Sequence, residues 1–211
     1  MPFNLETLRQ QMGSTIVLSD IPSITAYSID AGIYKINPRG IVLIESGRDL
    51  EAVLKYARDH QVPLTARSGG TNLTGNAIGE GLILEFSRLN QLLEINSSEQ
   101  WARVQPGMTY AELNCRLARE GWMFGPDPSS GEMCKVGGML GNNSAGPHTL
   151  KYGATKDNVL EMDVLLANGN WIVARDYQIN SPQFQNLILE NPFLGSVVQL
   201  IQEHLPLILV K

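Results

Sequence analysis

Stretches whose apolar residues recur at helical spacing alternate along this chain with short runs of consecutive apolar residues. The clearest helical stretch is Arg48–His60, whose apolar face consists of Leu50, Val53, Leu54 and Ala57. The same spacing predicts further helices over Thr109–Glu120 and Phe193–His204.

The helix predicted over Thr109–Glu120 also carries boundary signals. Thr109 is a suitable N-cap, and Glu112 stands three residues later, where its side chain can complete a capping box. Gly121 follows the last helical residue and can adopt the left-handed conformation that ends a helix.

The apolar runs predict strands, and their order suggests how the chain is organised. Strands are expected at Ile41–Ile44, Val62–Thr65, Leu82–Phe86, Leu92–Ile95, Trp101–Gln105 and Val159–Leu166. Asn168-Gly169 before the apolar residues 171–174 predicts a hairpin. The early β-α-β stretch and the later meander indicate two α+β lobes that meet around Ile95–Trp101.

Composition limits the class of protein. The 211 residues carry a net charge of −5 and no basic run, which argues against nucleic acid and anionic membrane as primary partners. The first residues lack the basic start and apolar core of a secretory signal. No apolar run approaches the roughly 18 residues of a transmembrane segment. We therefore expect a cytoplasmic protein.

Cysteine and histidine residues provide no metal site and no catalytic group. Cys115 and Cys134 are compatible with one disulfide, but two cysteines form neither a disulfide framework nor a metal-ligand spacing. His60, His148 and His204 form no metal spacing and no triad. His148 lies near a glycine-rich segment, where either a role at the site or simple exposure is open. No catalytic residue is assigned.

The first glycine-rich segment (residues 67–72) follows a predicted strand and reads Arg67-Ser68-Gly69-Gly70-Thr71-Asn72. Adjacent glycines let backbone N–H groups approach an anion, and short hydroxyl and amide side chains can add hydrogen bonds. The segment has neither the lysine of a P-loop nor the G-x-G-x-x-G of a Rossmann fold. It therefore indicates a pyrophosphate cradle of another design, or else a tight surface turn.

The second glycine-rich segment (residues 126–146) has the same character. It begins Pro126-Asp127-Pro128-Ser129-Ser130-Gly131, and Gly137-Gly138 is expected just before a short helical turn. The segment then continues as Asn142-Asn143-Ser144-Ala145-Gly146. Two such segments could hold the two ends of one long cofactor, although the paired asparagines could equally serve a turn.

These motifs carry a family resemblance that spans nearly the whole chain. The chain resembles the flavin-binding domain of FAD-linked oxidases of the vanillyl-alcohol oxidase or p-cresol methylhydroxylase type. Within that group it is most similar to the glycolate oxidase and D-lactate dehydrogenase branch. The matching stretches are Ala26–Gly32, Pro63–Thr71, Val104–Leu113, Pro126–Gly146, Lys151–Gly153 and Val164–Gly169.

The resemblance implies an α+β, two-lobed p-cresol methylhydroxylase-type FAD-binding domain with FAD between the lobes. Residues 1–36 would form an N-terminal extension and 37–211 the FAD-binding domain, with lobe one at about 37–97 and lobe two at about 98–211. Family members continue with a Ser-Glu-Gly-Thr-Leu run and a substrate cap domain. Neither is found before Lys211, so the domain is expected to be C-terminally incomplete.

The same resemblance implies which residues bind the cofactor. Those of the first segment would contact the pyrophosphate, and those of the second the ribityl and flavin parts. The implied set is Arg67, Ser68, Gly69, Gly70, Thr71, Asn72, Pro126, Asp127, Ser129, Ser130, Gly137, Gly138, Asn142, Asn143, Ser144, Ala145 and Tyr152. Tyr152 could also be a buried structural aromatic. Some relatives attach FAD through a histidine directly after the two glycines, and Thr71 there implies dissociable FAD.

The implied activity is oxidation of a 2-hydroxy acid, such as glycolate or D-lactate, with hydride transfer to flavin N5. A missing cap region would bind the substrate, and electrons would pass to an external acceptor or a partner subunit. Two alternatives remain: an FAD-binding or electron-transfer subunit without catalysis of its own, and a plain phosphate-binding α+β module.

Overall fold

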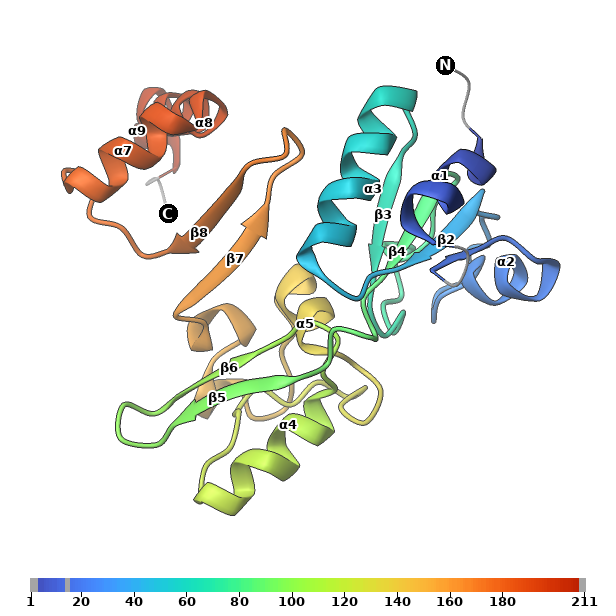
Figure 1. Cartoon of the computed structure of the whole chain (residues 1–211). Coiled ribbons are helices and arrows are strands. Elements are labelled where there is room, and N and C mark those ends of the chain that lie inside the picture. The colour runs from blue at the N-terminus through green and yellow to red at the C-terminus, as the bar shows by residue number, and fades with distance from the viewer. Residues whose placement is uncertain (1–3, 14–15, 209–211) are drawn as a thin grey trace. The chain divides into compact units, whose positions relative to one another are not determined.

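The structure is a computed structural model that describes residues 4–13 and 16–208. The chain divides into two compact units, Met1–Val159 and Leu160–Lys211. Figure 1 shows their elements in chain order.

The first unit mixes helices and strands. Its helices are α1 (Leu5–Met12), α2 (Ile21–Tyr27), α3 (Gly47–His60), α4 (Tyr110–Leu117), α5 (Val136–Asn142) and α6 (Thr149–Tyr152), with 3-10 turns η1 (Ala118–Glu120) and η2 (Thr155–Asn158). Its strands are β1 (Val17–Leu18), β2 (Gly40–Leu43), β3 (Leu64–Arg67), β4 (Leu82–Glu85), β5 (Leu92–Asn96) and β6 (Trp101–Val104). The unit contains the strands and helices predicted between Ile41 and Glu120 and the helical turn predicted near Gly138, together with α1, β1, α2 and α6, which the sequence did not predict.

A four-stranded sheet in the order β1-β2-β4-β3 forms the framework of this unit. β2, β4 and β3 are parallel, and β1 pairs antiparallel with β2 at the edge. The helix predicted over Arg48–His60 is α3, which runs alongside the sheet (Figure 1). β3 starts at Leu64 rather than Val62, because Pro63 has no N–H to donate to a ladder. The β-α-β prediction is confirmed.

The sheet is covered on both faces, as expected for parallel strands that are apolar throughout. Alternating side chains of β2 and β4 divide into two core clusters. The larger cluster packs Val42, Leu82 and Leu84 against Leu8 of α1 and Val53 of α3. The smaller cluster contains Ile41, Leu43 and Ile83, packed against Ile24 and Tyr27 of α2.

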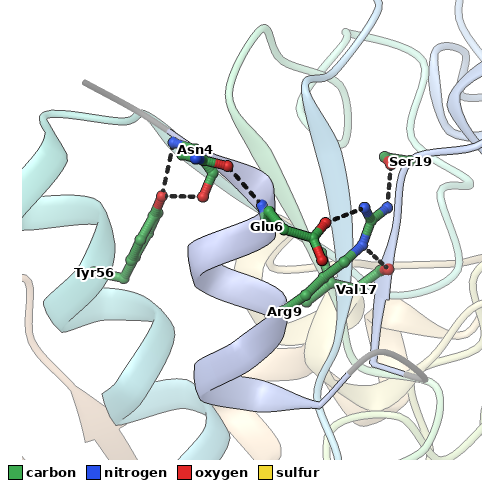
Figure 2. A network of polar contacts seen from close by, with 6 residues as sticks. All are labelled: Asn4, Glu6, Arg9, Val17, Ser19 and Tyr56. Carbon is green, nitrogen blue, oxygen red and sulfur yellow. Dashed lines mark hydrogen bonds and ion pairs between the residues drawn. The ribbon is translucent and has the colours of Figure 1, made fainter. Parts of the chain in front are cut away.

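The described part of residues 1–36 is built into this sheet rather than lying apart from it. Figure 2 shows the polar network that holds it, formed by Asn4, Glu6, Arg9, Val17, Ser19 and Tyr56. The hydroxyl of Tyr56 in α3 donates to the Asn4 carbonyl at 2.6 Å and accepts from the Asn4 N–H at 3.0 Å. Arg9 donates to the Val17 carbonyl at 3.4 Å and to the Ser19 hydroxyl. The network fixes α1 between α3 and β1.

β5 and β6 form an antiparallel hairpin, and α4 follows it. Thr109 caps α4 by accepting from the Glu112 N–H at 3.1 Å, and Gly121, with a φ of +77°, ends the 3-10 turn η1 that continues α4, so the predicted N-cap and glycine stop are confirmed. The Glu112 carboxylate accepts from Arg116 Nη2 at 3.1 Å instead of completing the predicted capping box. Leu113 and Leu117 of α4 pack in a separate core cluster with the hairpin and α5. The lobe boundary expected near residue 97 falls in the turn of this hairpin and remains a prediction.

The second unit begins with the predicted hairpin. β7 (Glu161–Leu165) and β8 (Trp171–Arg175) pair antiparallel around Gly169, whose φ is +94°. They are followed by α7 (Pro182–Glu190), α8 (Pro192–Glu203) and α9 (Leu205–Ile208). Asn191, only 4% exposed, accepts a hydrogen bond from the Asn170 amide at 3.1 Å. No helix among the described residues is long and apolar enough to span a membrane.

Candidate functional site

The first glycine-rich segment leaves the carboxyl end of β3 with its backbone donors free. Within the described part of the chain, none of the N–H groups of residues 68–73 donates a hydrogen bond to another residue. Gly70 has a φ of +62°, a conformation that side chains other than glycine rarely adopt. A run of consecutive free N–H groups is the arrangement that binds an anion such as pyrophosphate.

Arg67 holds this segment to its surroundings. Its Nη1 donates to the Ile29 carbonyl at 2.7 Å and to the Ala77 carbonyl at 3.2 Å. The guanidinium also lies over the Tyr27 ring, 5.1 Å from the centroid, and its burial lowers the pKa of Arg67 below the usual value. A Cβ on Gly70 would lie 2.6 Å from Nη2, so Gly70 contacts this guanidinium. These contacts identify Arg67 as a residue that shapes the segment.

Asn72 shapes the other end of the segment. Its side-chain oxygen accepts from the Thr74 N–H at 3.1 Å and from the Asn76 N–H at 2.9 Å. This is an Asx turn, a common role of asparagine in loops. The side-chain oxygen is thus engaged within the protein, whereas the backbone N–H of Asn72 stays free for a ligand.

The second glycine-rich segment begins with a rigid loop. Pro126 is fully buried, and turns form from Gly131 N–H to the Pro128 carbonyl and from Met133 N–H to the Ser130 carbonyl, at 2.9 and 2.8 Å. Ser129 at the loop tip is exposed. This part of the segment is ordered by its own hydrogen bonds.

Asp127 and His148 join the two ends of the second segment. The Asp127 carboxylate accepts from the His148 N–H at 3.1 Å, and its other oxygen lies 2.5 Å from His148 Nδ1. The Asp127 carbonyl also faces Gly146 so closely that a Cβ there would lie 1.9 Å from the oxygen. Asp127 therefore stabilises the conformation of the second segment. His148, whose role the sequence did not decide, is the hydrogen-bond partner of Asp127.

Gly137 and Gly138 lie inside the first turn of α5, not before it as expected. Gly137 donates to the Pro106 carbonyl at 2.8 Å, and a Cβ there would lie 2.8 Å from Pro106 Cβ. The Gly138 N–H donates to no other residue in the part of the chain that the structure describes. The glycines therefore bring the start of α5 close to its neighbours and leave one donor free.

The two segments lie side by side within the first unit. A Cβ placed on Gly69 would lie 2.7 Å from the Met133 carbonyl oxygen, and one on Gly138 would lie 2.7 Å from Ser68 Oγ. The Asn76 amide also donates to the Asn142 side-chain oxygen at 3.3 Å. The free N–H of Gly138 therefore lies close to Ser68, where the run of free N–H groups in the first segment begins.

The remaining candidates mostly have structural partners. Asn143 adopts the left-handed conformation at the end of α5, with a φ of +46°, and its side-chain oxygen accepts from the Lys156 N–H at 2.9 Å. The Ser144 carbonyl accepts from the backbone N–H and the hydroxyl of buried Thr155, at 2.9 and 2.7 Å. Ala145 is exposed. Tyr152 packs against Gly125, where a Cβ would lie 2.6 Å from its ring.

Two polar features beside the site were not singled out from the sequence. Asp30 Oδ2 is buried without a hydrogen-bond partner among the residues that the structure describes, while Oδ1 accepts from the Gly32 N–H at 2.8 Å. This carboxylate adjoins the first segment, because the Ala31 N–H donates to the Gly70 carbonyl at 3.1 Å. Lys135 reaches the end of β4. Asp30 lies in a stretch that carries the family resemblance, which was the available signal.

The three histidines lie on different elements of the structure. His60 ends α3 with its ring 4.2 Å from the Tyr56 ring, and His204 follows α8. Among residues 4–13 and 16–208, no group of three or more His, Cys, Asp or Glu side chains is placed to hold a metal ion.

The two cysteines are free thiols with different accessibility. Cys134 is buried next to Gly69, and burial raises the pKa of its thiol, whereas Cys115 is exposed on α4. We expect iodoacetamide at about pH 8 to modify the native protein only at Cys115, because the thiolate is the reactive form. Peptide mass spectrometry checks this; native protein alkylated at both cysteines would contradict it, and urea-unfolded protein serves as the doubly modified control.

Comparison with known proteins identifies the family. The family model described as an FAD binding domain matches residues 38–175. The chain is 36% identical over 149 residues to the glycolate oxidase subunit GlcD of Bacillus subtilis, covering 69% of this chain and 32% of that protein. It is 34% identical over 172 residues to D-2-hydroxyglutarate dehydrogenase of Pseudomonas putida, covering 80% of this chain and 17% of that protein.

Among solved structures, an alkyldihydroxyacetonephosphate synthase superposes with a TM-score of 0.74 at 23% identity, over 85% of this chain and 36% of that one. This likeness supports the two-lobed fold expected from the sequence. The chain thus spans less than two fifths of the length of the curated relatives named above. Because the family model covers residues 38–175, well over half of the sequence, the chain belongs to the FAD-binding domain family, and FAD is its cofactor.

Proposed function

We propose that this chain is the FAD-binding portion of a flavin-dependent dehydrogenase or oxidase that oxidises a 2-hydroxy acid. The relatives that this chain matches are named for glycolate, D-2-hydroxyglutarate and D-lactate. The observation that carries the proposal is the run of free N–H groups from Ser68 to Leu73 beside the free N–H of Gly138. Such donors stabilise a buried pyrophosphate without a lysine or a metal ion.

The residues present fit FAD. Donors of the first segment would hold the pyrophosphate, with Arg67 and Asn72 keeping the backbone in position. The close approach at Gly69 and Gly138 leaves no space for side chains between the two segments. Residues 142–145 would lie near the flavin end and orient it through backbone groups and amide side chains. When bound, FAD supplies a hydride acceptor at N5.

We also propose that FAD is held without a covalent bond. Thr71 stands where some relatives have the linking histidine, and its hydroxyl is a poor nucleophile toward the flavin. Trichloroacetic acid precipitation of FAD-loaded protein is expected to leave nearly all of the flavin in the supernatant. A yellow pellet after washing would contradict this, and protein precipitated before FAD is added provides the blank.

The second candidate is an FAD-binding or electron-transfer subunit without catalysis of its own. It is favoured by the name of one relative, because the glycolate oxidase protein GlcD is itself named a subunit. Substrate binding would then depend on a cap region, and electrons would pass to an external acceptor or a partner subunit. We place both functions in the cytoplasm, where free thiols such as Cys115 and Cys134 stay reduced.

An anaerobic titration separates the two candidates. FAD-loaded protein is mixed with glycolate, D-lactate or D-2-hydroxyglutarate, and the visible flavin absorbance is followed. Bleaching by one of them would support catalysis by this chain. Stable absorbance with all three, together with bleaching by dithionite as the control, would support the non-catalytic subunit.

A further inference from the structure

Lys135 connects the second glycine-rich segment to the sheet that carries the first. Its Nζ contacts the Ser87 hydroxyl and lies 3.8 Å from Glu85 Oε1. Both charged side chains are largely buried, with 6% of Glu85 and 15% of Lys135 exposed. A buried ion pair of this kind is costly to leave unpaired, so its position matters to the local fold.

Glu85 lies where the first segment begins. It is the last residue of β4 and pairs in the ladder with Arg67, the last residue of β3. Its Oε1 accepts from the Ser87 N–H at 3.0 Å and from the Ser87 hydroxyl. The Phe86 N–H donates to the Arg67 carbonyl at 3.0 Å. The carboxylate is thus fixed relative to the free donors that follow Arg67.

Lys135 lies where α5 begins. Its backbone forms a bridge with Thr109, and the next residue, Val136, donates to the Met108 carbonyl at 2.9 Å. Gly137 and Gly138 follow directly, so a displacement of Lys135 also moves the free Gly138 N–H. Lys135 is also the only lysine or arginine in residues 126–146. One side chain therefore connects the two sets of donors.

We propose that Lys135 is a positioning residue for the FAD site, which sets the distance between the two glycine-rich segments through Glu85 and Ser87. This inference rests on the proposed FAD site. Lys135 acts through Glu85 and Ser87, and the free N–H groups on either side contact the cofactor. Loss of the Lys135 charge lets α5 move away from Ser68, so the N–H groups no longer converge on one pyrophosphate.

The test uses the 211-residue chain and FAD itself as the probe. Lys135→Met is expected to weaken FAD binding by about tenfold or more, as expected when a charged hydrogen-bonding partner is lost. Binding is measured by quenching of FAD fluorescence, and the visible spectrum and midpoint potential of the bound flavin are recorded. Lys135→Arg, which keeps the charge, is expected to bind FAD within about threefold of the unaltered chain.

The matched control is Lys55→Met, which breaks an exposed ion pair with Asp59 in α3 and should leave FAD binding unchanged. A further variant, Lys135→Met with Glu85→Gln, removes both charges and keeps the chain folded even if Lys135→Met alone does not. The proposal expects this double variant to melt near the temperature of the unaltered chain while FAD binding stays about tenfold weaker.

Recovery of both melting temperature and FAD affinity in the double variant would overturn the proposal, as would unchanged affinity and flavin spectrum in Lys135→Met. Either result would give Lys135 a purely structural role. A failure of the proposed function looks different: the unaltered chain itself would then fail to quench FAD fluorescence, and the positioning role would fall with it.

Discussion

Replacing Gly69 with alanine is expected to weaken FAD binding by about a hundredfold. The added Cβ would lie 2.7 Å from the Met133 carbonyl oxygen and 3.4 Å from Cys134 Cα. Both are backbone atoms, so relief requires the two glycine-rich segments to separate. Overpacking of this kind costs about 1–3 kcal/mol, and the separation also removes the convergence of N–H donors on the pyrophosphate.

Gly141→Ala is the matched control for Gly69→Ala. Gly141 lies in α5, close to the site in sequence, and a Cβ there meets nothing within 4 Å. Because alanine favours a helix over glycine by about 0.5–1 kcal/mol, this variant should bind FAD normally and melt slightly higher. Isothermal titration with FAD measures the affinity of both variants, and thermal unfolding measures their melting temperatures. Equal affinity of Gly69→Ala and Gly141→Ala would disprove the close approach as the basis of the site.

The elements that the sequence predicted correctly are those with local causes. The capping of α4 by Thr109, and the end at Gly121 of the 3-10 turn η1 that continues α4, depend on residues within these two elements and their caps. The hairpin around Gly169 depends on the turn preference of Asn168-Gly169. By contrast, the edge strand β1 is only two residues long, Val17–Leu18, and pairs with a distant strand, so no local pattern marks it.

Only part of the candidate site could be predicted from the sequence. Residue types identified two glycine-rich segments, but their contact depends on tertiary packing at Gly69 and Gly138. Residue type alone also does not determine whether a side chain contacts a ligand or another part of the protein. Arg67 and Asp127 look like ligand-binding groups, yet each is engaged by the protein: Arg67 by the Ile29 carbonyl and Asp127 by His148.

Lys135 and Glu85 were missed for the same reason. A lysine before a helix and a glutamate at the end of an apolar strand are ordinary in sequence, and fifty residues of chain separate them. Their pairing follows from the packing of α5 near the end of β4. The usable signal was Glu85 itself, because a carboxylate that closes an otherwise apolar strand needs a partner.

Replacing Leu82 with alanine is expected to lower the free energy of unfolding by about 2–5 kcal/mol, the usual cost of a Leu→Ala cavity. Leu82 is 0% exposed and belongs to the larger core cluster, with neighbours in the ladder at Gly40 of β2 and Leu64 of β3. Urea unfolding followed by far-ultraviolet circular dichroism measures the loss. Leu93→Ala, the same change at a side chain 53% exposed, should cost less than about 0.5 kcal/mol.

FAD adds a second part to the Leu82→Ala prediction. Leu82 begins β4, whereas the free donors of residues 68–73 follow the carboxyl end of the parallel strand β3, at the opposite edge of the sheet, so the cavity should leave the cofactor site intact. FAD at about 100 times its dissociation constant stabilises a folded binder by about 2.7 kcal/mol. The same increment is expected in Leu82→Ala and in the unaltered chain, because the affinity of the folded state is unchanged. An increment that vanishes in Leu82→Ala would mean that core packing at Leu82 and the cofactor site cannot be separated.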